Sequence, residues 1–145
     1  MDNSEARSRA PLTGEQLAVI RKSFALLEDN LETVSGLLYQ RLFEIKPDFR
    51  PMFRSDIIDQ GMRFMSTLRT IVNHLESPES LHPFLVELAE GHAAYGVGPE
   101  HFPPMGEALI WTMKKTLGDG MPEGAEEAWR AAYKHVADEM IRLAK

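Results

Sequence analysis

Residues 81–92 read LHPFLVELAEGH, and this stretch decides the fold because it carries a histidine on an apolar helical face. Leu81, Leu85, Leu88 and His92 follow one another at steps of four, three and four, so they share one side of a helix. The imidazole at the end of this stripe is predicted to point inward, where its ring nitrogens need partners. From the residues alone, His92 is either a core histidine bonded to a backbone carbonyl or a ligand to a metal.

Apolar residues at helical spacing continue on both sides of this stretch. Thr13 and Gln16 form the pattern of a capping box before a first helix that ends near Leu27. Pro47 and Pro51 bracket a short segment that ends at Phe53, and they predict about one turn there. Further helices are expected at about 30–44 and 57–75, from about 80 to a break at Gly96, from Pro99 to a stop at Gly118, and at about 123–144. The chain is therefore predicted to be all-α, although periodicity alone equally permits an up-down bundle.

The composition bounds the class of protein. With 145 residues the chain fits one domain, which we expect to span residues 12–145 after a flexible tail at 1–11. The absence of cysteine excludes a disulfide scaffold, a thiolate metal site and a cysteine nucleophile. A formal net charge of -6 without a Lys/Arg cluster disfavours nucleic acid as a partner. The sequence has no signal peptide and no apolar run of roughly 20 residues, so we expect no membrane span and a cytoplasmic location.

Motifs for chemistry on protein side chains alone are missing. The sequence holds no HExxH, no GxSxG, no GxGxxG and no phosphate loop, and its histidines do not pair at i, i+4. A haem needs only one axial nitrogen and a flat apolar slot, so it suits a single inward histidine. The bulky residues that could line such a slot, or could simply belong to an ordinary core, are Phe53, Phe64, Met65, Phe102 and Met105.

Three segments resemble a known family. YQRLFEIKPDFRPMF (39–53), HAAYGVGPEHFPPMGEAL (92–109) and AEEAWRAAYKHVADEMI (125–141) are similar, in this order and spacing, to bacterial single-domain globins and to the globin domain of flavohaemoglobins. The resemblance covers about residues 12–144 and implies a three-over-three α-helical globin fold that binds haem b. The truncated two-over-two globins match less well, because residues 13–27 form a complete first helix and the chain has no Gly-Gly pair.

The resemblance implies roles for residues on both sides of the haem. His92 matches the proximal ligand to the iron, and Phe53 matches the phenylalanine that stacks on the porphyrin. Tyr39 and Gln60 match the two distal donors, and Phe64 matches the apolar residue one turn after the glutamine. A phenol and an amide can both donate a hydrogen bond to a bound ligand, which implies slow release of dioxygen.

A second interpretation remains open for each of the two distal residues, Gln60 and Tyr39. The gap from Phe53 to Gln60 is shorter than in flavohaemoglobins, and a shift by one or two residues would place Gly61 or Met62 over the haem instead. Tyr39 lies one step beyond the apolar row of its helix, so it could also be a surface tyrosine.

Other residues are expected at the edge of the pocket. Phe102 and Met105 are expected to line it. Arg63 either contacts a haem propionate from the distal helix or lies solvated at the surface. The same two interpretations apply to His101, which directly precedes Phe102.

The sequence departs from the flavohaemoglobin pattern on the proximal side. Those proteins place a tyrosine ten residues after the proximal histidine and a glutamate near the end of the last helix, where this chain has Phe102 and Ala144. Neither can make the histidine more electron-donating, so a backbone carbonyl near Leu88 is expected to orient His92. No reductase domain is expected after Lys145.

Together these features predict a haem globin that reversibly binds dioxygen, for storage, delivery or scavenging, and that also binds carbon monoxide and nitric oxide. Enzymatic activity is the weaker expectation. The first alternative is nitric oxide dioxygenation with a separate reductase. The second is a gas sensor that acts through a partner, and the third is a haem-free helical module.

Overall fold

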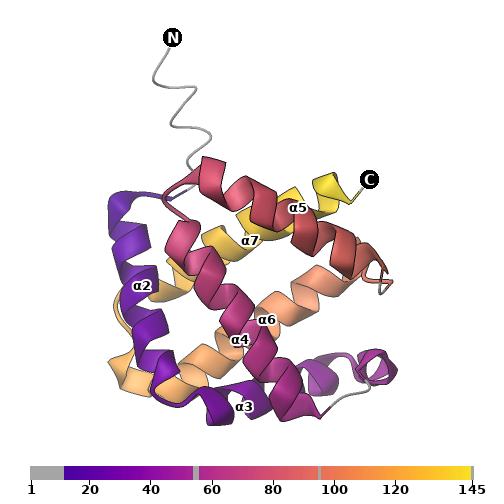
Figure 1. The fold of residues 1–145 in the computed structure, drawn as a ribbon. Helices are drawn as coiled ribbons and strands as arrows, with labels where there is room; N and C mark the ends of the chain where they lie inside the picture. Colours follow the sequence, from indigo (N-terminus) through magenta and orange to yellow (C-terminus); the bar gives the residue numbers. More distant parts are fainter. Residues whose placement is uncertain (1–11, 54–55, 95, 145) are drawn as a thin grey trace.

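The computed structural model describes residues 12–53, 56–94 and 96–144, and within them all regular structure is helical. The all-α prediction is therefore confirmed, whereas the predicted tail at 1–11 lies outside the described residues. The elements are α2 (Gly14–Glu28), α3 (Leu31–Ile45), η1 (Pro47–Met52), α4 (Ile57–His74), α5 (Pro78–Ala94), η2 (Pro99–His101), α6 (Phe102–Leu117), η3 (Gly118–Gly120) and α7 (Ala125–Leu143) (Figure 1). No helix in the described ranges is long and apolar enough to cross a membrane.

The helix ends follow local chemistry that the sequence makes visible. The Thr13 hydroxyl accepts from the backbone N–H of Gln16 at 3.1 Å, and the Gln16 side chain accepts from the backbone N–H of Thr13 at 2.9 Å, which confirms the capping box. Asp56 caps α4 through its carboxylate, a contact that contributes about 1 kcal/mol. Gly96 follows the end of α5 with a φ of 83°, a backbone conformation that favours glycine.

The core consists of two clusters of buried side chains. The larger one is built by α2, α3, α4, α6 and α7, and it includes Trp129, whose indole N–H donates to the Ser23 hydroxyl at 2.7 Å. The smaller one lies where α5 packs beside α7, at the top of the view in Figure 1. Its buried members are Ile71, Leu81, Leu85, Ala89 and Met140.

A glycine sets the contact between α3 and α4. A Cβ atom added at Gly61 would overlap the Cβ atom of Ser35 and lie 2.7 Å from its carbonyl oxygen, so only glycine permits this approach. The contact also fixes the rotation of α4. The side of α4 that carries Gly61 faces α3, and Gln60 and Phe64 therefore belong to a neighbouring face of the helix.

We expect Gly61→Ala to lower the free energy of unfolding by about 1–3 kcal/mol, because the added methyl group meets backbone as well as side-chain atoms. Urea denaturation followed by circular dichroism measures this effect. Gly36→Ala is the matched control on the same helix pair, since its Cβ atom would meet only the Ile58 side chain at 4.0 Å. The control is expected to be neutral or stabilising by up to about 1 kcal/mol, and equal stabilities for the two variants would contradict the close helix contact.

Candidate functional site

His92 lies in the last turn of α5 and is half-buried. Its Nδ1 atom is 2.7 Å from the Leu88 carbonyl oxygen. Because a carbonyl only accepts, Nδ1 carries the hydrogen and donates it, which leaves the lone pair on Nε2. The prediction that a backbone carbonyl near Leu88 orients this ring is confirmed, and no residue in the described part of the chain bonds to Nε2.

An aromatic ring lies beside the imidazole. The Phe102 ring is stacked on the His92 ring with their centroids 6.3 Å apart and an interplanar angle of 23°. Phe102 begins α6, so this contact joins the end of one helix to the start of another. The phenyl group has no hydrogen-bond acceptor to offer the imidazole.

Three aromatic rings, from α3 and from the residue that follows η1, pack together. Tyr39 is 4 % exposed, so the interpretation as a surface tyrosine is wrong. Its ring meets the Phe53 ring edge-on, with the ring centroids 5.0 Å apart. The centroid of the Phe43 ring lies 6.2 Å from that of Tyr39 and 5.6 Å from that of Phe53. Burial raises the pKa of Tyr39 above its usual value, so the phenol keeps its proton at neutral pH and remains a hydrogen-bond donor.

Helix α4 brings further predicted residues to the interior. Gln60 and Phe64 are both partly buried and lie one turn apart. Gly61 packs against Ser35 of α3, and Met62 is 42 % exposed. This packing disfavours the shifted alignment, in which Gly61 or Met62 would take the place of Gln60. Arg63 is exposed.

The corner between α5 and α6 holds His101. Its Nδ1 atom accepts from the backbone N–H of Gly98 at 2.8 Å, and its ring lies 4.8 Å from the Phe49 ring. The His101 side chain is partly exposed, at 17 %, so its position is compatible with both interpretations given above. Met105, one turn into α6, is partly buried against the larger core cluster.

The arrangement fits a haem. His92 presents an sp² nitrogen for which the described residues supply no other partner. The Tyr39 side chain is buried, and burial is the only influence on the pKa of its hydroxyl, so no described residue bonds to that group either. Some large apolar side chains that pack against the two core clusters are only partly buried. They are Phe53, Phe64 and Met105 at the larger cluster, and Leu88 and Phe102 at the smaller one. No group of three His, Asp or Glu side chains that could hold a metal ion by themselves occurs in the described ranges.

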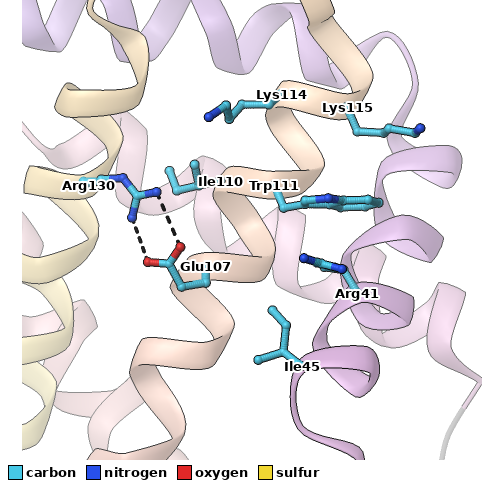
Figure 2. A pocket seen from close by; sticks show the side chains of 8 residues that line it. All are labelled: Arg41, Ile45, Glu107, Ile110, Trp111, Lys114, Lys115 and Arg130. Atoms are coloured by element: carbon cyan, nitrogen blue, oxygen red, sulfur yellow. Dashed lines mark hydrogen bonds and ion pairs between the residues drawn. The ribbon is translucent and has the colours of Figure 1, made fainter.

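A groove of about 370 Å³ on the outer side of α3, α6 and α7 contains none of the predicted site residues (Figure 2). Several of its charged side chains form ion pairs, either with one another or with residues beside the groove. Arg130 pairs with Glu107 at 2.7 Å, and Lys114 pairs with Glu126 at 3.0 Å. We interpret this groove as a solvent-exposed ion-pair network of small energetic value.

Two contacts of the site were not predicted from the sequence. Phe43 completes the aromatic cluster, and its spacing of four residues from Tyr39 on one helix is a signal that could have found it. The Tyr133 hydroxyl donates to the Phe102 carbonyl oxygen at 2.7 Å. These residues are 31 positions apart, and no local sequence pattern predicts their contact.

Comparison with known proteins identifies relatives of the chain. The family model described as Globin matches residues 36–140. A flavohemoprotein of Halalkalibacterium halodurans is 28% identical over 141 residues, which cover 95% of this chain but only 34% of that protein. The chain thus spans about a third of the length of this relative.

Two solved structures are also similar to the chain. A bacterial globin from Campylobacter jejuni superposes with a TM-score of 0.77 at 26% identity, and the match covers 91% of this chain and 96% of that one. An engineered carbene transferase from Rhodothermus marinus, whose parent is provisionally named a nitric oxide dioxygenase, gives a TM-score of 0.80 at 25% identity, with 92% and 93% covered.

Proposed function

Because the chain belongs to the globin family, we propose that it holds a haem b through His92 and binds dioxygen reversibly. Membership of this family implies a haem and a diatomic gas as its ligand. A haem would supply an iron with one coordination position open to such a gas. Storage, delivery or scavenging of dioxygen are the roles that this chemistry serves.

The residues of the chain divide this task between them. His92 offers Nε2 to the iron while Leu88 fixes the plane of its ring through Nδ1. Tyr39 and Gln60 would donate hydrogen bonds to a gas bound there. Phe53, Phe64, Phe102 and Met105 would exclude water from the porphyrin. Arg63 lies exposed on α4, and its guanidinium would bind a propionate.

The observation that carries this proposal is the hydrogen bond from Nδ1 of His92 to the backbone carbonyl of Leu88. A neutral carbonyl accepts the Nδ1 hydrogen at 2.7 Å, whereas a carboxylate in its place would make the imidazole a stronger electron donor. Phe102 lies beside the ring without adding an acceptor. A weakly donating axial ligand favours reversible binding over cleavage of the O–O bond.

The buried phenol of Tyr39 favours a second candidate function, which is nitric oxide dioxygenation with a separate reductase. Slow release of dioxygen would keep it available for reaction with nitric oxide. The flavohemoprotein relative and the Rhodothermus marinus structure are consistent with this alternative.

Gas uptake and nitric oxide turnover distinguish the two functions. The protein reduced with dithionite and desalted is cycled between air and argon, and its spectrum is followed. We expect repeated uptake and release of dioxygen with little conversion to the ferric form. Stoichiometric, non-recurring consumption of nitric oxide would agree with this, whereas sustained turnover with NADPH and an added flavin reductase would establish the dioxygenase instead.

A further inference from the structure

We propose that the groove on the outer side of α3, α6 and α7 binds a small aromatic carboxylate beside Trp111. The residues of this groove are not among those assigned to the haem, so the inference goes beyond the proposed function and does not depend on it. The groove measures about 370 Å³, which lies within the range of small-molecule sites. A concave site of this size suits a small molecule better than a protein partner, whose interface needs a much larger area.

The floor of the groove is apolar. It is formed by Ile45 of α3 and by Ile110 and Trp111 of α6 (Figure 2). Ile110 is 3 % exposed, whereas Ile45 and Trp111 are only partly buried. The partly exposed indole offers a flat surface to an aromatic ring, and aromatic pairs are favourable beyond the area that they bury. The floor therefore favours a ligand with a flat apolar body.

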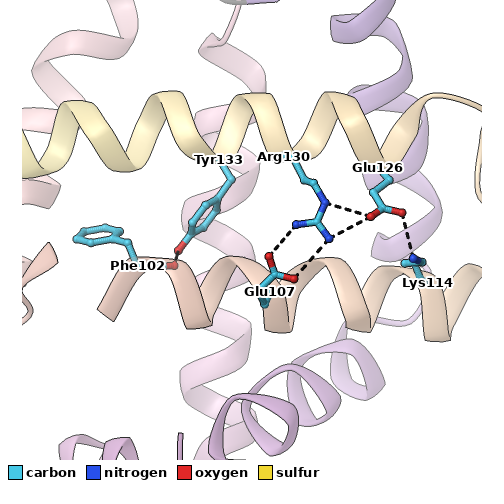
Figure 3. Close-up of polar contacts among 6 residues, drawn as sticks. All are labelled: Phe102, Glu107, Lys114, Glu126, Arg130 and Tyr133. Atoms are coloured by element: carbon cyan, nitrogen blue, oxygen red, sulfur yellow. Dashed lines mark hydrogen bonds and ion pairs between the residues drawn. The ribbon is translucent and has the colours of Figure 1, made fainter. Parts of the chain in front are cut away.

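The cations on the α7 side of the groove are already neutralised. Arg130 pairs with Glu107 at 2.7 Å and with Glu126 at 3.0 Å. Glu126 also pairs with Lys114 at 3.0 Å, so the four side chains form one network between α6 and α7 (Figure 3). Its two carboxylates balance its two cations, and an anion would gain little on this side of the groove.

The cations beside Trp111 are not balanced in this way. Lys115, four residues after Trp111 on α6, forms no ion pair with any described residue. The Arg41 guanidinium stacks on the indole with its Cζ atom 4.9 Å from the ring centroid, and its Nη1 atom donates to Glu44 at 3.2 Å. Two cations are thus accompanied by a single carboxylate, which leaves an excess of positive charge here in a chain whose net charge is -6.

The groups around the indole that lack an acceptor among the described residues are all hydrogen-bond donors. They are the ammonium of Lys115, Nη2 of Arg41 and the indole N–H of Trp111. The N–H of Trp129 differs, because it donates to Ser23 in the core. Donors that include two cations, placed beside an apolar floor, are suited to a carboxylate carried by an apolar ring.

A titration with naphthoate, followed by the indole N–H signals in a proton–nitrogen correlation NMR spectrum, tests the proposal. The protein is reduced under carbon monoxide, because low-spin ferrous iron is diamagnetic. A chain without haem is diamagnetic as well, so the readout does not depend on the proposed function. We expect the Trp111 signal, identified by its loss in Trp111→Phe, to shift in a saturable way, and the Trp129 signal to stay in place. Acetate has the charge without the ring and naphthamide has the ring without the charge, and both should bind much more weakly.

Lys115→Gln and Arg41→Gln should each weaken the binding of naphthoate by about two- to five-fold, which is the effect of losing one exposed ion pair. Lys22→Gln is the control, because it removes the same charge from an exposed residue of α2, outside the groove. A Trp111 signal that does not move, or that moves equally with acetate or naphthamide, overturns the proposal, as does equal weakening in Lys22→Gln. Shifts that appear when the protein alone is concentrated would assign this face to a contact between copies of the chain and would overturn it too.

Discussion

His92→Gly is expected to lower the affinity for haem by more than about 100-fold, because even the outer partners of metal ligands contribute about 10–100-fold. The variant loses the nitrogen that Leu88 holds in position and leaves only apolar contacts to the porphyrin. Haem transfer to an excess of apomyoglobin measures the change. In the ferrous protein the spectrum of a histidine-bound iron should disappear.

Imidazole added to His92→Gly should restore that spectrum, because the free ring can enter the space left by the side chain. His82→Ala is the matched control, since this histidine lies on the same helix and is exposed. It should retain haem as the wild type does. Wild-type affinity in His92→Gly, or an equal loss in His82→Ala, would contradict the assignment of His92.

Tyr39→Phe is expected to accelerate the dissociation of dioxygen by about 10–100-fold. A hydrogen bond to an acceptor with negative charge contributes roughly 1.5–3 kcal/mol, and about 1.4 kcal/mol corresponds to a factor of ten. Stopped-flow displacement of dioxygen by carbon monoxide measures the rate. Raising the pKa by burial keeps the phenol protonated, so the wild-type rate should not change between pH 6 and pH 9.

The unfolding free energy provides the control for this variant. Among the described residues none bonds to the Tyr39 hydroxyl, so its removal should leave stability unchanged or slightly higher. Gln60→Leu should give a smaller increase in the dissociation rate, because the phenol remains. If Tyr39→Phe released dioxygen at the wild-type rate, the phenol would not be a distal donor.

Local signals made much of the fold predictable. The Thr13 capping box and the apolar periodicities gave the helices and most of their ends. The Leu88 carbonyl was predictable as the partner of His92, because residues four apart on a helix are neighbours. The residues expected in the site on α3, α4, α5 and α6 were likewise chosen from spacing and resemblance.

Contacts between distant segments were not predictable in the same way. The approach of Gly61 to Ser35 depends on how α3 and α4 cross, which periodicity alone does not specify. The hydrogen bond of Tyr133 to Phe102 depends on how α7 is positioned along the axis of α6. Both contacts arise from tertiary packing, and both determine how the predicted residues are presented in the site.

The most direct test of the central claim is the visible absorption spectrum of the purified protein in three states, namely ferric, reduced with dithionite, and reduced under carbon monoxide. We predict a strong Soret band that shifts on reduction and shifts again when carbon monoxide binds. A protein that shows no Soret band, even after hemin has been added, would contradict the account and leave an all-α globin fold without a haem.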